Sequence, residues 1–249
     1  MKRLIVNADD LGYSQEVNAQ IFGGIDNGHI TSATLLMNAP AAEAAVRELS
    51  HYPQASFGVH LNVTEFPPLT RHPGQAELCN ENGEFKKKEL WVPSTTEIRE
   101  AIFTEWCGQV QRAYDLGVPV SHLDSHHHVH TRPKLFPVLK RVQRRFGIRK
   151  VRLTRNIYAV DSRLRIGVLP AKAAWNLALR NYYRTQTTDG FTDFSTFHSR
   201  LEAGLPWRGT IELMCHPGNP GFETETKLLG TDWKETLSSQ AQLISYNGL

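Results

Sequence analysis

The chain of 249 residues carries a net charge of +3, with 40% hydrophobic and 21% charged residues. This balance is that of an ordinary soluble globular protein with a sizeable core, and the charge is too small to require a polyanionic partner. The three cysteines (Cys79, Cys107 and Cys215) are far apart and lack C-x-x-C spacing. This argues against a disulfide framework and for a reducing compartment. No signal-peptide pattern follows Met1, and no apolar stretch reaches about 18 residues, so we expect a cytoplasmic protein without a membrane partner.

Short apolar runs and amphipathic segments alternate over the first sixty residues. Ser14 is placed to cap a helix whose inward face carries Val17 and Ile21, and Gly28 stands near its end. Strands are predicted over residues 4–6, 31–37 and 57–62, and a second helix over residues 40–49. This β-α repeat favours a parallel sheet.

The rest of the chain is less regular. Residues 64–93 are rich in proline and glycine, and we interpret them as a long loop with a small hairpin near Asn82. Residues 155–197 show a weak pattern apart from an amphipathic helix over residues 171–182. Further strands are predicted from Val118 and over residues 150–153 and 209–214, and further helices from Ser94 and over residues 133–147 and 233–243. An α/β domain spanning residues 1–249, either a barrel or an open sheet, is the simplest organisation.

Five of the eleven histidines fall within residues 121–130, which read S-H-L-D-S-H-H-H-V-H. In a strand, every second residue of this stretch would share one face. Thr131-Arg132-Pro133 is typical of a helix start, so we expect a strand that turns into a histidine-rich loop. Because neighbouring imidazolium ions repel one another, the rings are expected to be mostly neutral, with some of them directed at a metal ion.

Four predicted strand ends carry polar side chains of the types that commonly act in catalysis. They are Asp9-Asp10, His60, Asp124 with the histidines of residues 126–130, and His216. Because parallel strands present their carboxyl ends at one edge, these groups are expected to meet there. The set predicts two histidines and one carboxylate on a divalent ion, with a second carboxylate as a base toward an activated water. The pattern does not distinguish His126, His127 and His128 as ligands.

The sequence resembles the YdjC-like carbohydrate deacetylases, which include chitooligosaccharide deacetylases. The resemblance rests on five blocks that extend over nearly the whole chain in the order of the family. They are N-A-D-D-L-G at residues 7–12, T-S-A-T at 31–34, G-V-H-L-N at 58–62, H-L-D-S-H-H-H-V-H at 122–130 and E-L-M-C-H-P-G at 212–218.

This resemblance implies a deformed TIM-like barrel of mostly parallel strands, with helices outside. It implies that Asp10, His60 and His126 bind a divalent ion, either magnesium or zinc. Asp9 would be the general base, and His216 would be the acid or a stabiliser of the transition state. The implied reaction removes the N-acetyl group from an amino sugar or a small N-acetylated oligosaccharide of the chitobiose type, through attack of a water that the ion activates.

The resemblance leaves parts of the site open. His127, His128 and His130 have no assigned role, and Asp124 is expected to orient a neighbouring imidazole. Trp91, in the irregular loop, is the tryptophan we favour as a sugar contact, whereas Trp106 lies on the inward stripe of its helix.

Three alternatives compete with this interpretation. Residues 131–172 contain thirteen Lys or Arg and one acid, which suits a metal-dependent phosphodiesterase or a nucleic-acid-binding protein. Many of these cations alternate with the apolar stripe of a predicted helix, so a solvated face is the default and a nucleic-acid partner is not expected. Cys215 beside His216 suggests a thiol enzyme, but strand neighbours point to opposite faces. A non-catalytic sugar-binding or metal-binding protein is the third alternative. A homodimer is compatible with the sequence, which leaves the oligomeric state open.

Overall fold

The computed structural model describes residues 2–87, 95–159, 162, 167–204, 206–237 and 241–249. The strands are β1 (Lys2–Leu11), β2 (Ser32–Leu35), β3 (Ser56–Leu61), β4 (Val120–Ser125), β5 (Gly190–Asp193), β6 (Gly209–Cys215) and β7 (Ala241–Leu243). The α-helices are α1 (Gln15–Asp26), α2 (Ala42–Glu48), α3 (Thr96–Asp115), α4 (Phe136–Phe146), α5 (Val168–Asn181), α6 (Phe194–Glu202) and α7 (Glu223–Leu229).

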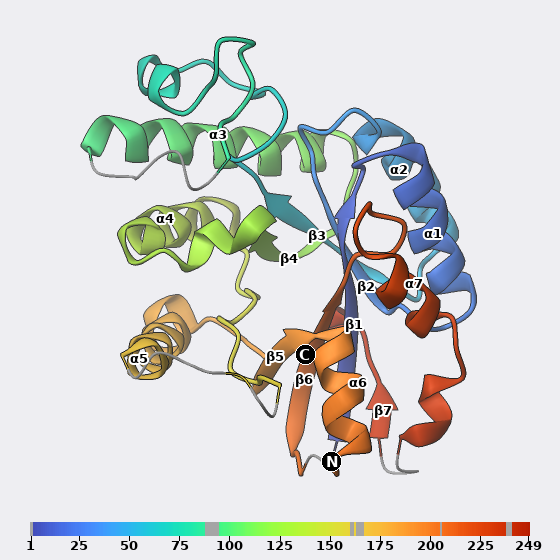
Figure 1. Ribbon diagram of the computed structural model, residues 1–249. Helices are drawn as coiled ribbons and strands as arrows, with labels where there is room; N and C mark the ends of the chain where they lie inside the picture. The colour runs from blue at the N-terminus through green and yellow to red at the C-terminus, as the bar shows by residue number, and fades with distance from the viewer. Residues whose placement is uncertain (1, 88–94, 160–161, 163–166, 205, 238–240) are drawn as a thin grey trace.

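The strands form one parallel sheet in the order β4-β3-β2-β1-β6-β5, and β7 pairs with β1. The sheet curls into a half-barrel with helices on its outer side, α1 and α2 at one flank and α3, α4 and α5 at the other (Figure 1). This arrangement confirms the predicted deformed TIM-like barrel. Because all these strands run in parallel, their carboxyl ends meet at one edge.

A short irregular segment links the two ends of the sheet. Leu123 of β4 donates its N–H to Lys150 and accepts one from Arg152, and Val151 donates to Gln186. The strand predicted over residues 150–153 is therefore wrong, because Lys150 and Val151 form only isolated bridges, each to a different neighbour. Even so, the segment brings Arg152 into the interior of the barrel, where it is fully buried.

Near the carboxyl end, the helix predicted over residues 233–243 is also wrong. Trp233–Thr236 is a 3-10 turn, and Ala241–Leu243 is strand β7. The pairing with β2 begins at Asn7, so the first residues of β1 have that side open for β7. Strand β5 lies within residues 155–197 and helix α6 begins there at Phe194, whereas we predicted only the helix over residues 171–182 for that segment. A strand of four residues is too short for a periodic signal.

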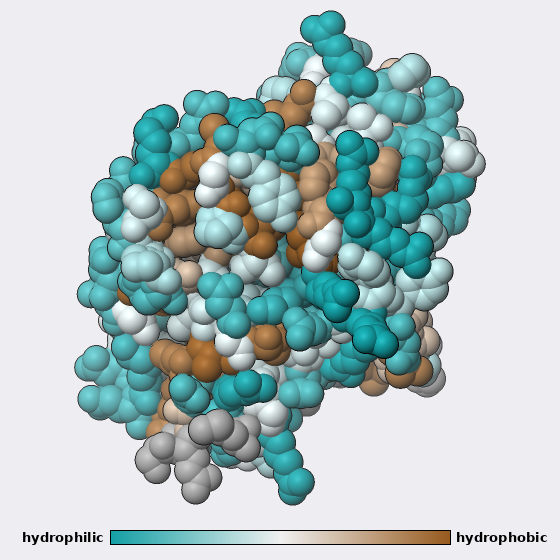
Figure 2. All heavy atoms as spheres, turned by 180° about the vertical axis from the view of Figure 1, so that it is seen from behind, coloured by the Kyte–Doolittle hydropathy of each residue, from teal (hydrophilic) through white to brown (hydrophobic). Residues whose placement is uncertain are grey.

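Several local predictions hold. The helix predicted from Ser94, a residue outside the described ones, is α3, which begins at Thr96 with Thr95 as its cap, and Trp106 of that helix is fully buried in the core. Strand β4 ends at Ser125, and a 3-10 turn over His126–Thr131 follows it, as expected of a strand that becomes a histidine-rich loop. The face seen in Figure 2 is mainly hydrophilic, with apolar residues gathered in a few recessed areas. Among the described residues, no helix is both long and apolar enough to cross a membrane.

Candidate functional site

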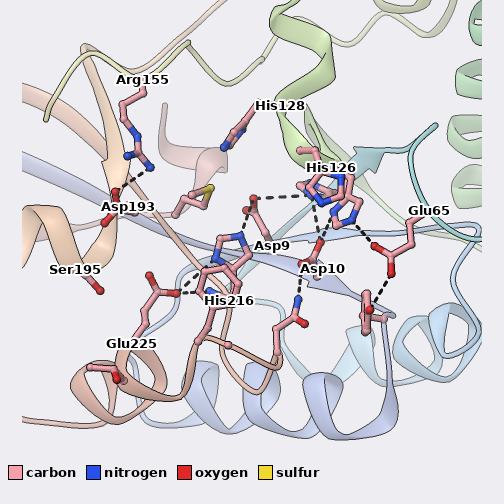
Figure 3. Close-up of a pocket in the computed structure, with 18 residues that line it drawn as sticks. Asp9, Asp10, Glu65, His126, His128, Arg155, Asp193, Ser195, His216 and Glu225 are labelled. Atoms are coloured by element: carbon pink, nitrogen blue, oxygen red, sulfur yellow. Dashed lines mark hydrogen bonds and ion pairs between the residues drawn. The ribbon is translucent and has the colours of Figure 1, made fainter. Parts of the chain in front are cut away.

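A cavity of about 600 Å³ lies at the carboxyl ends of the strands. Loops that follow parallel strands converge at this edge, which is where active sites of such barrels form. The cavity brings together all five residues that were predicted for chemistry, which are Asp9, Asp10, His60, His126 and His216. Figure 3 labels Asp9, Asp10, His126 and His216 among the residues that line it.

A β-bulge directs both aspartates into this cavity. Neighbouring residues of a regular strand point to opposite faces, so Asp9 and Asp10 would ordinarily diverge. Between Ala8 and Leu11 the register of β1 with β2 shifts, and Asp10 takes the left-handed backbone angle φ 66°. This conformation costs about 1–2 kcal/mol for a residue with a Cβ atom. The bulge thus places two adjacent carboxylates in one cavity.

The side chains of Asp10, His60 and His126 form a buried group whose ligand atoms lie within 4.8 Å of one another. Asp10 Oδ1 is 2.9 Å from His126 Nδ1 and 3.4 Å from His60 Nε2. No described group donates a well-aligned hydrogen bond to this buried oxygen. An oxygen in that position, between two imidazoles, is suited to a cation, and two imidazoles with a carboxylate are a known donor set for divalent metals. The residues present therefore fit a divalent ion.

Asp124 orients His60. Its Oδ1 accepts a hydrogen bond from His60 Nδ1 at 2.7 Å, so Nε2 is the ring nitrogen directed at Asp10. Burial alone would lower the pKa of His60, but the carboxylates of Asp124 and Asp9 outweigh burial and raise this pKa to about 10. The same negative charge would stabilise a divalent cation.

Glu65 holds His126 in a similar way, although the sequence did not identify it. Glu65 Oε2 lies 3.0 Å from His126 Nε2, and Tyr13 donates its hydroxyl to Glu65 Oε1 at 2.9 Å. Nδ1 of His126 is thereby directed at Asp10. Burial lowers the pKa of His126, but Asp10 and Glu65 outweigh it and raise the pKa. Glu65 follows β3 in the irregular loop, where no periodic pattern marks a functional residue.

Arg152 is fully buried and contacts three carboxylates. Its guanidinium donates two hydrogen bonds of 2.6 Å to Asp9, one to each oxygen. It also lies 2.8 Å from Asp124 and 2.7 Å from Glu212. Burial favours the neutral acid at Asp9, but Arg152 outweighs it and holds the pKa of Asp9 well below its ordinary value. Asp9 is therefore ionised and fixed in orientation.

Glu212 and Tyr246 complete the buried network around Arg152. Burial raises the pKa of Glu212 to about 7, although Arg152 and the Tyr246 hydroxyl oppose this shift. Tyr246 donates to Glu212 Oε2 at 2.5 Å, and its ring stacks on His122 with centroids 3.5 Å apart. His122 thus packs in the interior and is not among the described residues that line the cavity.

His216 lies close to Asp9 and to Glu225 of α7. Its Nε2 is 4.0 Å from Asp9 Oδ2, and its Nδ1 is 3.5 Å from Glu225 Oε1. Its main-chain N–H donates to the same Glu225 oxygen at 2.6 Å. Burial lowers the pKa of His216, but Glu225 and Asp9 outweigh burial and raise it. The imidazole therefore holds a proton more readily than an ordinary histidine does.

Two other histidines of the tract, His127 and His130, differ in burial and in their contacts. His130 is buried, with Nδ1 2.5 Å from Ser125 Oγ, and burial lowers its pKa to about 3. It also donates its main-chain N–H to Ser125 Oγ at 2.9 Å, so it holds the turn together. His127 is exposed, and its Nδ1 lies 3.0 Å from Thr64 Oγ1.

The aromatic lining of the cavity differs from our expectation. Trp91, which we favoured as a substrate contact, lies outside the described residues. Phe222, which the sequence did not single out, lines the cavity, is 38% exposed and stacks on His216 with centroids 4.2 Å apart.

The thiol alternative has no support in the site. Cys215 is fully buried, burial raises the pKa of its thiol well above the ordinary value, and Sγ lies 3.6 Å from the Asn7 carbonyl oxygen. A nucleophilic cysteine needs an accessible thiolate.

The basic segment also engages in contacts within the protein. Arg141 makes two hydrogen bonds to Glu100, at 2.5 and 2.9 Å. Lys140 is buried and donates to acceptors that include the Leu179 carbonyl at the end of α5. Arg152 belongs to the buried network. A phosphate-binding surface relies on exposed cations, so these contacts favour a structural use of the segment.

Comparison with known proteins agrees with this fold. The family model described as YdjC-like protein matches residues 3–242. The chain belongs to the YdjC-like family. A carbohydrate deacetylase of Geobacillus stearothermophilus is 44% identical over 220 residues, which cover 86% of this chain and 78% of that protein. A carbohydrate deacetylase of Halalkalibacterium halodurans is 34% identical over 217 residues, covering 86% of this chain and 84% of that protein.

A solved structure shares the fold of this YdjC-like chain. It is an Enterococcus faecalis V583 protein whose name refers to cellobiose-phosphate cleavage, with a TM-score of 0.80 and 24% sequence identity. The match covers 99% of this chain and 98% of that one. At this identity the similarity supports the barrel alone.

Proposed function

We propose that this YdjC-like protein is a metal-dependent deacetylase that hydrolyses the N-acetyl group of an amino sugar or a small N-acetylated oligosaccharide. The observation that carries the proposal is the meeting of Asp9 and His216 with the Asp10, His60 and His126 group in one cavity. The relatives described as carbohydrate deacetylases support the same reaction. Two imidazoles and a carboxylate suit zinc, and magnesium is the alternative ion.

Asp9 is proposed as the general base. Its bidentate contact with Arg152 keeps it ionised and leaves it about 4 Å from both His60 and His216. A bound divalent ion would make a water acidic and polarise the acetyl carbonyl. A carboxylate with a lowered pKa is a weak base, so Asp9 can take a proton only from a water of that kind. The proposed role of Asp9 as a base therefore depends on an ion held by Asp10, His60 and His126 beside it.

His216 is proposed as the acid. The amine of an acetylated sugar is a poor leaving group until it is protonated, so the reaction needs a proton donor. The raised pKa of His216 favours its protonated form, and Glu225 Oε1 lies 3.5 Å from its Nδ1. The pKa of Asp9 is lowered and the pKa of His216 is raised within one cavity, which suits a base and an acid that act as a pair.

The proposal is tested by measuring acetate release from N-acetylated mono- and disaccharides with metal-stripped protein and with protein reloaded with zinc or magnesium. We expect activity only after reloading, and a loss of at least about 100-fold with a chelator. Cleavage of oligonucleotides by the same samples tests the phosphodiesterase alternative. Nuclease activity without acetate release would contradict the proposal.

Glu65→Gln should weaken metal binding by about 10–100-fold, because the amide no longer holds His126 as a charged carboxylate does. Competition with a chromophoric chelator measures this affinity. Glu48→Gln, an exposed position on the outside of the barrel, is the matched control and should leave the affinity unchanged. Equal affinity in the Glu65→Gln and wild-type proteins would show that Glu65 does not support the metal ligand.

A further inference from the structure

Asn219 connects the turn after β6 to the proposed metal ligand Asp10. Its side-chain Nδ2 lies 2.7 Å from Asp10 Oδ2. An ionised carboxylate only accepts hydrogen bonds, so the NH₂ end of the Asn219 amide is the end that faces Asp10. Asn219 is partly buried and lines the main cavity. The sequence did not identify it, and the proposed reaction gives it no role.

This contact divides the two oxygens of Asp10 between two sets of partners. Oδ2 accepts from Asn219, whereas Oδ1 lies 2.9 Å from His126 Nδ1 and 3.4 Å from His60 Nε2. Rotation of the carboxyl group about its last bond is soft, so without a restraint both oxygens could turn toward one ion. Asn219 therefore favours Oδ1 alone as a ligand. A single oxygen from Asp10 keeps a coordination position open, as catalytic metal sites require.

Other contacts of Asp10 do not supply this restraint. Its backbone takes the left-handed angle φ 66°, and its carbonyl accepts the N–H of Tyr13 at 3.0 Å. These main-chain features fix the bulge but leave the carboxyl group free to rotate. His60 and His126 would direct their nitrogen lone pairs at a bound ion and would then no longer donate to Asp10. Asn219 remains as the described side chain that donates to this carboxylate in the loaded site.

The turn that carries Asn219 also carries the proposed acid His216. Asn219 donates its main-chain N–H to the His216 carbonyl at 3.2 Å, and its own carbonyl accepts the N–H of Phe222 at 3.1 Å. Helix α7 braces the turn, because Gly218 donates its main-chain N–H to Thr226 Oγ1 at 3.1 Å. Asn219 and His216 therefore belong to one braced turn, and the Asn219 amide ties that turn to the metal ligand.

We propose that Asn219 is a positioning residue that holds Asp10 with one oxygen toward the metal ion and couples metal binding to the turn of His216. When an ion fixes Asp10, Asn219 gains a fixed acceptor and the turn becomes more ordered. Coupling of this kind is reciprocal, so loss of the Asn219 contact should also weaken metal binding. This inference rests on the proposed metal site and adds to the proposed function a link between the ion and the acid.

The first test measures the zinc affinity of metal-stripped protein by competition with a chromophoric chelator. Asn219→Ala should weaken this affinity about 10–100-fold, the range expected when a hydrogen bond that orients a metal ligand is lost. Asn219→Leu removes the same donor but keeps a side chain of similar size, so it should weaken the affinity by a similar factor. Wild-type affinity in either variant would overturn the inference.

Asn156→Ala is the matched control. The Asn156 side chain donates to the Asp189 carbonyl at 3.0 Å and accepts the N–H of Phe191 at 2.8 Å. It is not among the described residues that line the main cavity. This variant therefore loses hydrogen bonds of a structural asparagine and should keep the wild-type zinc affinity. An equal loss of affinity in Asn156→Ala and Asn219→Ala would contradict the inference, because it would indicate a general effect of destabilisation.

Amide hydrogen exchange tests the coupling with a readout that a purely structural role of Asn219 would not change. In the wild-type protein, zinc should slow exchange at the main-chain N–H groups of Asn219 and Phe222 at least about fivefold, the low end of typical coupling between sites. In Asn219→Ala brought to the same zinc occupancy, zinc should leave exchange at Phe222 unchanged. An equal effect of zinc on Phe222 in the two proteins would overturn the coupling.

These measurements keep the inference separate from the proposed reaction. Zinc binding without acetate release would contradict the proposed function, and the affinity and exchange comparisons would still decide the role of Asn219. Wild-type protein that binds no zinc through the Asp10, His60 and His126 group would overturn both the metal site and the inference.

Discussion

Asp9→Asn is expected to reduce kcat for acetate release by at least about 10³-fold. An amide cannot take the proton that a carboxylate base accepts, and general bases contribute about 10²–10⁴-fold to such reactions. Steady-state kinetics with a reloaded metal measure the effect. The bound metal should remain, because Asp9 is not one of the proposed ligands Asp10, His60 and His126.

Two further measurements make this result specific. Thermal unfolding should show that Asp9→Asn is folded, since Arg152 keeps its contacts with Asp124 and Glu212. Asp115→Asn, at the exposed end of α3, is the matched control and should retain full activity. Metal-loaded Asp9→Asn protein with activity within about tenfold of wild type would exclude Asp9 as the base.

Arg152→Met is expected to lower the free energy of unfolding by about 3–5 kcal/mol at neutral pH, because it leaves buried carboxylates without their cation. Denaturant unfolding at pH 7 measures this loss. Arg141→Met is the matched control. Arg141 forms a comparable ion pair with Glu100, but the Arg141 side chain is 45% exposed and the Glu100 side chain 39%. An exposed pair should contribute about 0–1 kcal/mol.

The loss of stability in Arg152→Met should also depend on pH, in a direction that the pKa of Asp9 determines. In the wild-type protein the pKa of Asp9 lies below its unfolded value, so Asp9 contributes stability above about pH 4 that is lost as the pH falls. Without Arg152, burial should raise the pKa of Asp9 above its unfolded value. The variant should then lose stability as the pH rises above about 4 and should approach wild type in acid. A constant difference between the two proteins from pH 4 to pH 8 would contradict this account.

The residues at the strand ends could be predicted from the sequence because they follow recognisable apolar runs. Asp9, His60 and His216 each stand just past such a run, and parallel strands bring their ends together. The choice of His126 among its neighbours came from resemblance, since spacing alone treats the three histidines alike. The parallel sheet followed from the β-α alternation, and its deformed barrel form came from the family resemblance. The irregular closure through Arg152 followed from neither.

The supporting residues of the site could not be predicted, for identifiable reasons. Arg152 lay in a run of cations whose default place is a solvated face. It is instead turned inward by a segment that bridges two strands. Glu65 and Glu225 come from an irregular loop and a short helix, and each reaches its histidine only through tertiary contacts. One available signal was that Arg152 stands between Val151 and Leu153, two apolar residues in a strand-like run.

The most direct test of this account is a titration of metal-stripped protein with zinc or magnesium, following bound metal and acetate release from an N-acetylated sugar together. We predict one tightly bound ion per chain, with activity rising in proportion to occupancy. His126→Ala should bind no ion at the same concentrations, whereas His51→Ala, at an exposed position, should behave as wild type. Full activity in protein shown by elemental analysis to be free of metal would contradict the account.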